Sequence, residues 1–303
     1  MKQNIFLSLL QLLMIFCALF LLFSGITAIT SLAFTSGFMQ NTATVKTLQM
    51  ISQIMTFLGT AIIFLKTNKI KIKDYWGIDA KISMMITALI VLLFFVDAPF
   101  VSWLSDVGSK IKFSGKLGIW QQNMEQITKT SEDIVNSMIN TKSFPSFLGN
   151  LLVIGFVPAV CEEAVFRGCV QKLLTDRMKN IHIAIILSSI IFSAVHVDIQ
   201  NSLARIVLGM LLGYIFFYTK DIKMSMLLHF INNSGVIITA YYNCLTNNCD
   251  EGKTMTSLFE NPFAITASLI LIVAIIVVMR KLSIQNVSSG CVVTGRNDND
   301  DKR

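Results

Sequence analysis

The sequence predicts an all-α integral membrane protein, a polytopic bundle of about eight transmembrane helices. The chain has 303 residues, of which 53% are hydrophobic and only 14% are charged, whereas a soluble domain has about 25% charged residues. The mean hydropathy is +0.65. The apolar residues also gather in runs, as spanning helices of about 20 residues require. This composition excludes a soluble globular enzyme, a disordered chain and a disulfide scaffold.

The first apolar run, from Ile5 to about Phe34, is expected to be a retained transmembrane helix. A signal peptide has an apolar core of about 7–15 residues, and this run is longer and lacks a convincing cleavage site. Seven further spans follow from later apolar runs. Their approximate bounds are Leu48–Leu65, Ile82–Leu104, Phe147–Leu174, Ile183–Val197, Leu203–Tyr218, Met224–Tyr242 and Phe263–Met279.

The distribution of lysine and arginine predicts the orientation. Eight helices place both termini on one side, and cytoplasmic loops are rich in Lys and Arg. The net charge of +7 is therefore assigned to cytoplasmic loops of a cell-membrane protein, and no nucleic-acid partner is expected. The basic residues on the expected cytoplasmic side are Lys66, Lys69, Lys71, Lys73, Lys81, Arg177, Lys179, Lys220, Lys223, Arg280 and Lys281.

Two segments on the opposite side have distinct features. The loop Asn243–Asn261 contains Cys244 and Cys249, which form either a disulfide in an oxidising compartment or two unpaired thiols. The long loop Ser105–Ser146 predicts an amphipathic helix, which either lies on the outer surface or packs on its neighbours. Its apolar positions are Trp120, Met124, Ile127, Ile134 and Met138. The tail Asn286–Arg303 is polar and is expected to be disordered.

Charged residues inside the fourth span are the first functional signal. An ionisable group at the bilayer centre costs about 2.5–3.5 kcal/mol on insertion scales, so such groups pair with one another or perform a function. Glu163 and Arg167 are four residues apart and can pair on one helix face. Glu162 points about 100° away from Glu163 and stays free. The alternative is a charge cluster at a helix end.

Two histidines on later spans are the second signal. His196 follows Phe192 by four residues, and Asn233 follows His229 by four, so each pair shares a helix face. Glu162 and His196 each lie about 20 Å from the cytoplasmic end of their helices, and His229 and Asn233 lie about 10 and 16 Å deep. The groups can therefore converge.

Other polar residues of the spans carry weaker signals. Pro158, one turn before Glu162, can kink the helix and free backbone carbonyls. Asp97, two residues before Pro99, lines a cavity or marks a helix end. Arg205 is expected to extend towards the interface. His182 is interpreted as an ordinary interfacial residue.

A glutamate and a histidine on either side of a water molecule can activate it as a nucleophile. A second histidine and an asparagine amide can stabilise the oxyanion that forms at a carbonyl. This set suits amide hydrolysis without a cofactor. Zinc is the alternative, with His196, His229 and Glu162 as three ligands and an open fourth position. The usual His-Glu-x-x-His helix of zinc proteases is absent.

The three motifs in order resemble those of the CPBP family of CAAX prenyl endopeptidases and bacteriocin-processing or immunity proteins. They are Glu-Glu-x-x-x-Arg at 162–167, Phe-x-x-x-His at 192–196 and His-x-x-x-Asn at 229–233. The segment Gly209–Gly213 is also similar, and its glycines would allow close helix contact. The resemblance covers about a third of the chain, Phe147–Tyr241. It suggests a catalytic core at 147–242, flanked by membrane segments at 1–146 and 243–303.

The resemblance implies an intramembrane protease of the glutamate type. Glu162 and His196 would then activate the water, His229 and Asn233 would form the oxyanion hole, and Glu163 and Arg167 would orient the site. A membrane-associated, prenylated or leader peptide would be the substrate. Family members were long described as metal-dependent. Two other function classes stay open: a non-catalytic scaffold or bacteriocin-immunity protein, and a transporter that uses the buried carboxylates. No inverted repeat supports the transporter.

Overall fold

A computed structural model describes residues 5–33, 42–78, 83–246, 249 and 261–293, and these residues form helices and connecting turns without a β-strand. The helices in chain order are α1 Ile5–Ala33, α2 Thr42–Gln53, η1 Ile54–Leu58, α3 Gly59–Thr67, α4 Ile72–Trp76, α5 Met84–Ser109, α6 Gly115–Ile139, α7 Phe144–Asn150, η2 Leu151–Phe156, α8 Val157–Val165, η3 Phe166–Gln171, α9 Lys172–Arg177, α10 Ile181–Val195, α11 Ser202–Thr219, α12 Ile222–Thr246 and α13 Pro262–Val293.

The predicted helical bundle is confirmed. In the described part of the chain, six helical segments are long and apolar enough to cross a membrane. The other two predicted spans correspond to the shorter apolar helix α10 and to the 25-residue helix α12, which is not among these six. The six segments are Ile5–Ile29, Thr42–Thr67, Met84–Ser109, Phe144–Arg177, Ser202–Thr219 and Pro262–Ser283.

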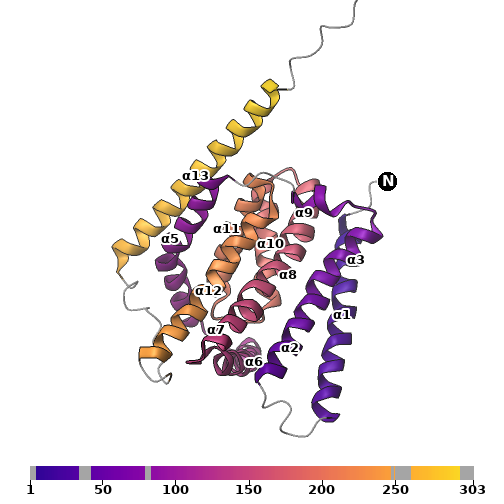
Figure 1. The fold of residues 1–303 in the computed structure, drawn as a ribbon, viewed down its shortest axis with the longest axis vertical. Coiled ribbons are helices and arrows are strands. Elements are labelled where there is room, and N and C mark those ends of the chain that lie inside the picture. The colour runs from indigo at the N-terminus through magenta and orange to yellow at the C-terminus, as the bar shows by residue number, and fades with distance from the viewer. Residues whose placement is uncertain (1–4, 34–41, 79–82, 247–248, 250–260, 294–303) are drawn as a thin grey trace, which may run out of the picture.

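The helices α8, α10 and α12 lie between α1 and α3 on one side and α5 and α13 on the other (Figure 1). On one side, α1 and α3 contribute Leu12, Phe64 and Leu65 to a buried cluster. On the other side, α5, α11 and α13 form a second cluster that includes Ile90 and Leu212. Burying these side chains supplies the favourable free energy of helix contact. The helix that contains α8 is thereby held in the middle of the bundle.

Three segments of the spanning helices are π-helical. They are η1 within the second span, and η2 and η3 on either side of α8 within the fourth. A π-helical turn widens the hydrogen-bond ladder and occurs mostly at functional sites. Pro158 lies in the first turn of α8, directly after η2. The expected distortion of the fourth helix near Pro158 is therefore present.

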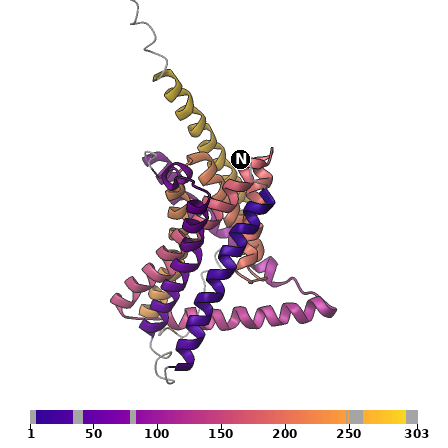
Figure 2. The same cartoon turned by 90° about the vertical axis from the view of Figure 1, so that its right-hand side faces the viewer.

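The predicted amphipathic helix in the long loop is α6, which lies across one end of the bundle (Figure 2). The sequence left open whether this helix lies on the outer surface or packs on its neighbours, and α6 does both. Met138 is buried, so the end of α6 packs on its neighbours. Trp120, Ile127 and Ile134 are about half exposed and form an apolar stripe along the helix. That stripe is suited to the headgroup region of a bilayer.

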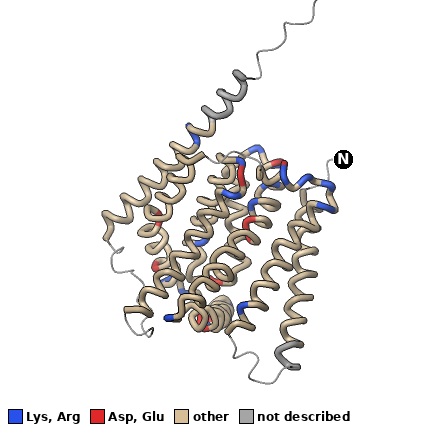
Figure 3. The backbone as a smooth tube through the Cα atoms, viewed as in Figure 1, with Lys and Arg blue, Asp and Glu red and all other residues tan. Residues whose placement is uncertain are grey.

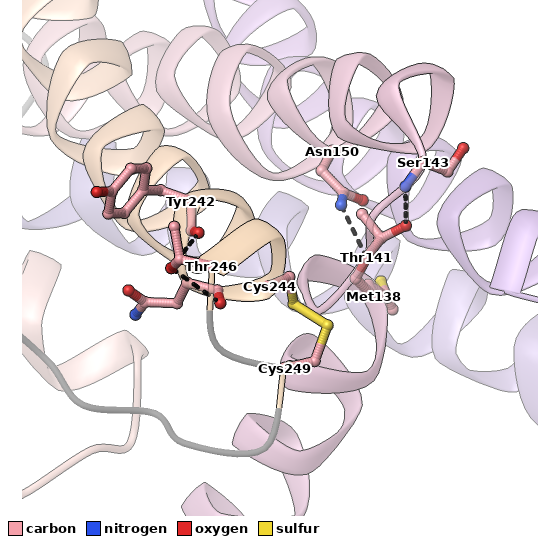
Figure 4. The surroundings of a disulfide bond; sticks show 9 residues. Met138, Thr141, Ser143, Asn150, Tyr242, Cys244, Thr246 and Cys249 are labelled. Carbon is pink, nitrogen blue, oxygen red and sulfur yellow. Dashed lines mark hydrogen bonds between the residues drawn. A yellow bond between two sulfur atoms is a disulfide. The ribbon is translucent and has the colours of Figure 1, made fainter.

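The two ends of the bundle differ chemically. Lys and Arg gather at the end opposite α6, around the loops that follow α3 and α11 (Figure 3). Cys244, in the last turn of α12, forms a disulfide with Cys249 at the α6 end of the bundle, beside the connection from α6 to α7 (Figure 4). The disulfide alternative is therefore correct. Most of the loop 243–261 lies outside the described residues.

One of the two alternatives for Asp97 and the expectation for the start of the tail are wrong. Asp97 and Pro99 do not mark a helix end, because α5 continues through both to Ser109 and buries Asp97 to 2% exposure. Proline is tolerated inside membrane helices, where neighbouring helices satisfy the freed backbone groups. The tail does not lose helical structure at Asn286, since α13 continues to Val293. Residues 294–303 of the predicted disordered tail lie outside the described residues.

Candidate active site

A cluster of polar side chains from four helical segments lies inside the bundle. Glu162 and Glu163 are on α8, Arg167 is on η3, His196 follows α10, and His229 and Asn233 are on α12. The two glutamates and Arg167 are at most 5% exposed. The residues that the sequence singled out are thus brought to one place by helices that are far apart in the chain.

Glu163 is the centre of a buried ion-pair network. Its Oε1 accepts a hydrogen bond from Arg167 Nη1 at 2.9 Å and another from His229 Nδ1 at 3.0 Å. Arg167 Nη2 also donates to the backbone carbonyl of Gly209 on α11 at 2.9 Å. A buried guanidinium needs such charge-assisted partners to offset its desolvation. The network fixes the position of the His229 ring.

Glu162 faces the other way and contacts both imidazoles. Its Oε2 lies 3.5 Å from His196 Nε2 and 3.9 Å from His229 Nε2. This oxygen is buried and has no hydrogen-bond partner among the described residues. Buried polar atoms of proteins are nearly always hydrogen-bonded. Glu162 Oε2 is therefore held between two imidazole Nε2 atoms at 3.5 and 3.9 Å.

The hydrogen bonds of the histidine Nδ1 atoms orient both rings. His196 Nδ1 lies 2.8 Å from the carbonyl oxygen of Phe192. A carbonyl only accepts, so Nδ1 donates this hydrogen bond and Nε2 is the ring nitrogen that faces Glu162. His229 Nδ1 likewise donates a hydrogen bond, in this case to Oε1 of Glu163. The side chain of His196 is 29% exposed, which makes it the accessible edge of the cluster.

Asn233 is held by the proline-distorted helix. Its Nδ2 donates to the carbonyl oxygen of Ile154 at 3.3 Å. Pro158 follows Ile154 by four residues and has no N–H to offer that carbonyl. A primary amide has two donor hydrogens, so one remains for a further acceptor. The expectation that Pro158 frees a carbonyl near the site agrees with this contact.

The loop after His196 is tied to two helices. Val197 has a left-handed φ of 56°, which is strained for a β-branched residue. Its carbonyl accepts from Thr128 of α6 at 3.3 Å. Asp198 Oδ2 accepts from Arg205 Nη2 and from the Asn201 amide, each at 2.8 Å. Arg205 therefore does not simply extend to the interface, because its charge is paired with Asp198.

The environment of Asp198 favours its ionised form. Burial raises the pKa of the carboxyl group, but the hydrogen bonds from Arg205 and Asn201 outweigh burial and hold that pKa below its ordinary value. The carboxylate is thus charged at neutral pH and keeps the loop closed around the turn that follows His196.

Sequence reasoning missed several residues of the site. Phe192 served only as a spacing marker in its motif, yet its ring contacts both imidazoles and the Arg167 guanidinium, with centroid distances of 4.8, 5.9 and 4.7 Å. Gln53 of α2 interacts with the Glu162 carboxylate. Its only sequence signal was a polar residue within a predicted span.

The glycines of the segment Gly209–Gly213 in α11 have a steric role. A Cβ at Gly209 would lie 3.0 Å from the Cβ of Ser189 on α10, and one at Gly213 would lie 2.8 Å from the Gln171 side chain. Gln171 Nε2 in turn donates to the carbonyl of Gly213 at 2.9 Å. The expected close helix contact is therefore present, and it brings backbone carbonyls within reach of Arg167 and Gln171.

In the zinc alternative, His196, His229 and Glu162 would be the metal ligands. Within the part of the chain that the structure describes, no group of three or more His, Cys, Asp and Glu side chains has a metal-binding arrangement. His196, His229 and Glu162 nevertheless direct Nε2 and Oε2 atoms towards one another.

Comparison with known proteins concerns this same region. Residues 144–235 match the family model described as Rce1-like, type II CAAX prenyl endopeptidase. The match begins at α7 and ends within α12, so it contains all six candidate site residues. It covers just under a third of the 303 residues. No curated protein and no solved structure gave a match. The recognition of the CPBP family from the three motifs is confirmed by the family match.

Proposed function

We propose that this CPBP-family membrane protein is a glutamate-type intramembrane endopeptidase that hydrolyses a peptide bond with an activated water molecule. The observation that carries the proposal is the buried Oε2 of Glu162, which faces the Nε2 atoms of both His196 and His229 at 3.5 and 3.9 Å. A water molecule bound there would contact both a carboxylate and a neutral imidazole, which are the two groups best suited to accept its proton.

The reaction balances with these groups alone. Glu162 and His196 take one proton from the water as its oxygen attacks the substrate carbonyl. The carbonyl oxygen becomes an oxyanion, which the free amide hydrogen of Asn233 and Nε2–H of protonated His229 would stabilise. The proton held by Glu162 and His196 then moves to the amide nitrogen and the C–N bond breaks. The products are a new carboxyl terminus and a new amine.

The buried charges support this assignment of protons. With Glu162 and Glu163 ionised and Arg167 and His229 protonated, the cluster has no net charge, which lowers the cost of burying it. Glu163 accepts from both cations and would keep the His229 ring directed at the reacting carbonyl. Glu163 and Arg167 are thus proposed as positioning residues.

The substrate is proposed to be a membrane-associated peptide, such as a prenylated or leader peptide. The match to the type II CAAX prenyl endopeptidases supports this class. The protein is an integral membrane protein, and we propose that it lies in the cell membrane with both termini in the cytoplasm. The reaction as written needs no cofactor.

Cleavage by purified protein in nanodiscs tests the proposal. Membrane peptides from the host are incubated with the native chain, with Glu162→Ala and with His196→Ala, and the new termini are sequenced. Cleavage by the native chain should be lost in both variants. The control Asp106→Ala, which removes an exposed carboxylate of α5, should cleave normally. Unchanged cleavage by Glu162→Ala would refute the proposal.

A chelator arm addresses the zinc alternative. Cleavage by protein treated with a metal chelator should persist at the native rate. If it is lost and returns only with added Zn²⁺, a zinc-bound water replaces the metal-free mechanism.

A further inference from the structure

The candidate active site lies next to the end of the bundle that α6 covers. His196 directly follows the last residue of α10. The carbonyl of the next residue, Val197, accepts a hydrogen bond from Thr128 of α6. In the same turn, the backbone of Gln200 packs directly against Gly108, near the end of α5. This turn is therefore part of the α6 end of the bundle, and His196 is its first residue.

The accessible part of the site faces the same end. The side chain of His196 is 29% exposed, and the neighbouring residues Val195 and Val197 are 39% and 41% exposed. Glu162 contacts His196 from the other side and is only 5% exposed. Exposure therefore decreases from the turn at the α6 end towards the glutamate in the interior of the bundle.

Towards the opposite end, a buried layer covers the site. Each of the three site helices continues in that direction with a side chain that is at most 2% exposed. These side chains are Gln171 of η3, Ser188 of α10 and Ser225 of α12. Trp76 of α4 packs on the same layer, because its Nε1 donates to the carbonyl of Gly168 at 3.3 Å. Within the described residues, this buried layer separates the polar cluster from the basic loops.

Two independent features indicate that the α6 end lies outside the cytoplasm. Lys and Arg gather at the opposite end of the bundle (Figure 3), and cytoplasmic loops of membrane proteins are enriched in these residues. The disulfide between Cys244 and Cys249 lies at the α6 end (Figure 4), and disulfides persist in oxidising compartments outside the cytosol. Both features indicate the same orientation.

We propose that the active site opens to the extracytoplasmic side, and that its substrate is a peptide segment presented on that side of the membrane. An exported leader peptide, or the outer end of a membrane-spanning peptide, reaches His196 and then Glu162 from the α6 end. A prenylated chain in the cytoplasm would meet the buried layer instead. This inference rests on the proposed protease function and narrows its substrate class.

Cysteine labelling tests the side from which the site is reached, and it does not depend on cleavage. Val197→Cys, next to His196, and the control Lys179→Cys, in the turn between α9 and α10, are made in a chain whose Cys17 and Cys291 are replaced by serine. Each chain is treated with a membrane-impermeant maleimide in sealed right-side-out and inside-out vesicles. Val197→Cys should react about tenfold faster or more in right-side-out vesicles, because thiol labelling requires access, and Lys179→Cys should show the reverse.

Three labelling results would overturn the proposal. Faster reaction of Val197→Cys in inside-out vesicles would place the opening on the cytoplasmic side. Equal rates in both orientations would show that the buried layer does not close the site. Reaction only after denaturation would show that the turn is not open to water from outside. If Val197→Cys does not fold, Ala194→Cys, an exposed position in the last turn of α10, gives the same measurement.

The positions of the cleaved bonds separate this inference from the protease function. Peptide ends that are present with the native chain and absent with Glu162→Gln should belong to exported peptides or to the extracytoplasmic ends of membrane segments. Glu162-dependent ends at cytoplasmic C-termini would leave the protease function intact and overturn the proposed side. If no peptide end depends on Glu162, the protease function fails, and the substrate class fails with it, whatever side the labelling of Val197→Cys indicates.

Discussion

At the residue scale, the two adjacent glutamates have different tasks because neighbouring side chains on a helix point about 100° apart. Glu163 Oε1 accepts from Arg167 and His229, whereas Glu162 Oε2 faces the Nε2 atoms of His196 and His229. One carboxylate stabilises the fold and the other is available for chemistry. This difference can be measured, because the two should respond oppositely to substitution.

Glu162→Gln should abolish cleavage and leave the melting temperature unchanged or raised. The neutral amide removes a buried charge that has no hydrogen-bond partner at Oε2. Activity and thermal unfolding are measured on the same purified sample. A large fall in the melting temperature would show that Glu162 is a structural residue.

Arg167→Met should destabilise the protein by about 3–5 kcal/mol, the usual effect of removing one partner of a buried ion pair. Glu163 would then be left without its guanidinium, and the carbonyl of Gly209 would lose a donor. Denaturant unfolding in detergent measures the loss. A stability equal to that of the native chain would contradict the network.

Part of this residue-scale picture was accessible from sequence. The pairing of Glu163 with Arg167 follows from a spacing of four within one helix, and 2.9 Å separates the two groups. The contact between Gln53 and Glu162 was not accessible, because it depends on how two helices more than 100 positions apart pack together. Arg205 was misread for a similar reason: its partner Asp198 lies across a turn from it.

At the element scale, the helices that carry the site depart from regular α-helix where the chemistry requires it. The fourth span is π-helical before and after α8, and Pro158 opens its backbone ladder so that Asn233 can bond to Ile154. Hydrophobic periodicity located this span to within a few residues. It could not show the π-helical turns, because they depend on neighbouring helices rather than on apolar spacing.

The loop after His196 gives one prediction with a defined pH dependence. Asp198→Asn should lower cleavage at least several-fold, because Arg205 loses its charged partner and the loop behind His196 loosens. The pKa of Asp198 is lowered in the fold, so the stability that this pair contributes is complete above the ordinary pKa of about 3.9 and is lost as pH falls through the lowered value.

The rate loss in Asp198→Asn should consequently be the same at every pH above about 5. Rates of the variant and the native chain are compared from pH 5 to 9. A shift of the whole pH profile in the variant would mean that Asp198 titrates as part of the reaction rather than holding the loop.

The close approach of α11 to the fourth span gives a second element-scale prediction. Gly213→Ala should destabilise the protein by about 1–3 kcal/mol, the typical cost of overpacking, because the new Cβ would meet Gln171 and Ile185 at 2.8 Å. Gly149→Ala is the control, since no heavy atom lies within 4 Å of its added Cβ. Equal melting temperatures for the two variants would refute the steric role.

At the scale of the whole molecule, the arrangement has two chemically distinct ends. The basic loops lie at one end, and α6 and the disulfide lie at the other (Figures 3 and 4). The fold class and the succession of spans followed from composition, because lipid requires every backbone group to be satisfied within a helix. The position of α6 in the folded protein could not be predicted from the sequence. An amphipathic pattern fits a lipid surface and a protein surface equally well.

The proposed orientation predicts which end is accessible from outside the cell. Lys129→Cys on α6 should react with a membrane-impermeant maleimide on intact cells, whereas Lys73→Cys on α4 should react only after lysis. The unsubstituted chain gives the background from its own cysteines. The reverse labelling pattern would invert the proposed topology.

The central claim is that Glu162 activates water for peptide hydrolysis. A comparison of the peptides produced in living cells tests this claim most directly. The membrane and secreted peptides of cells that carry the native protein are compared with those of cells that carry Glu162→Gln at equal expression. We expect new peptide ends that are present with the native protein and absent with the variant, and their sequences would identify the substrate. Identical peptide profiles, with the cellular effect retained by the variant, would contradict the claim and indicate a scaffold that does not cleave.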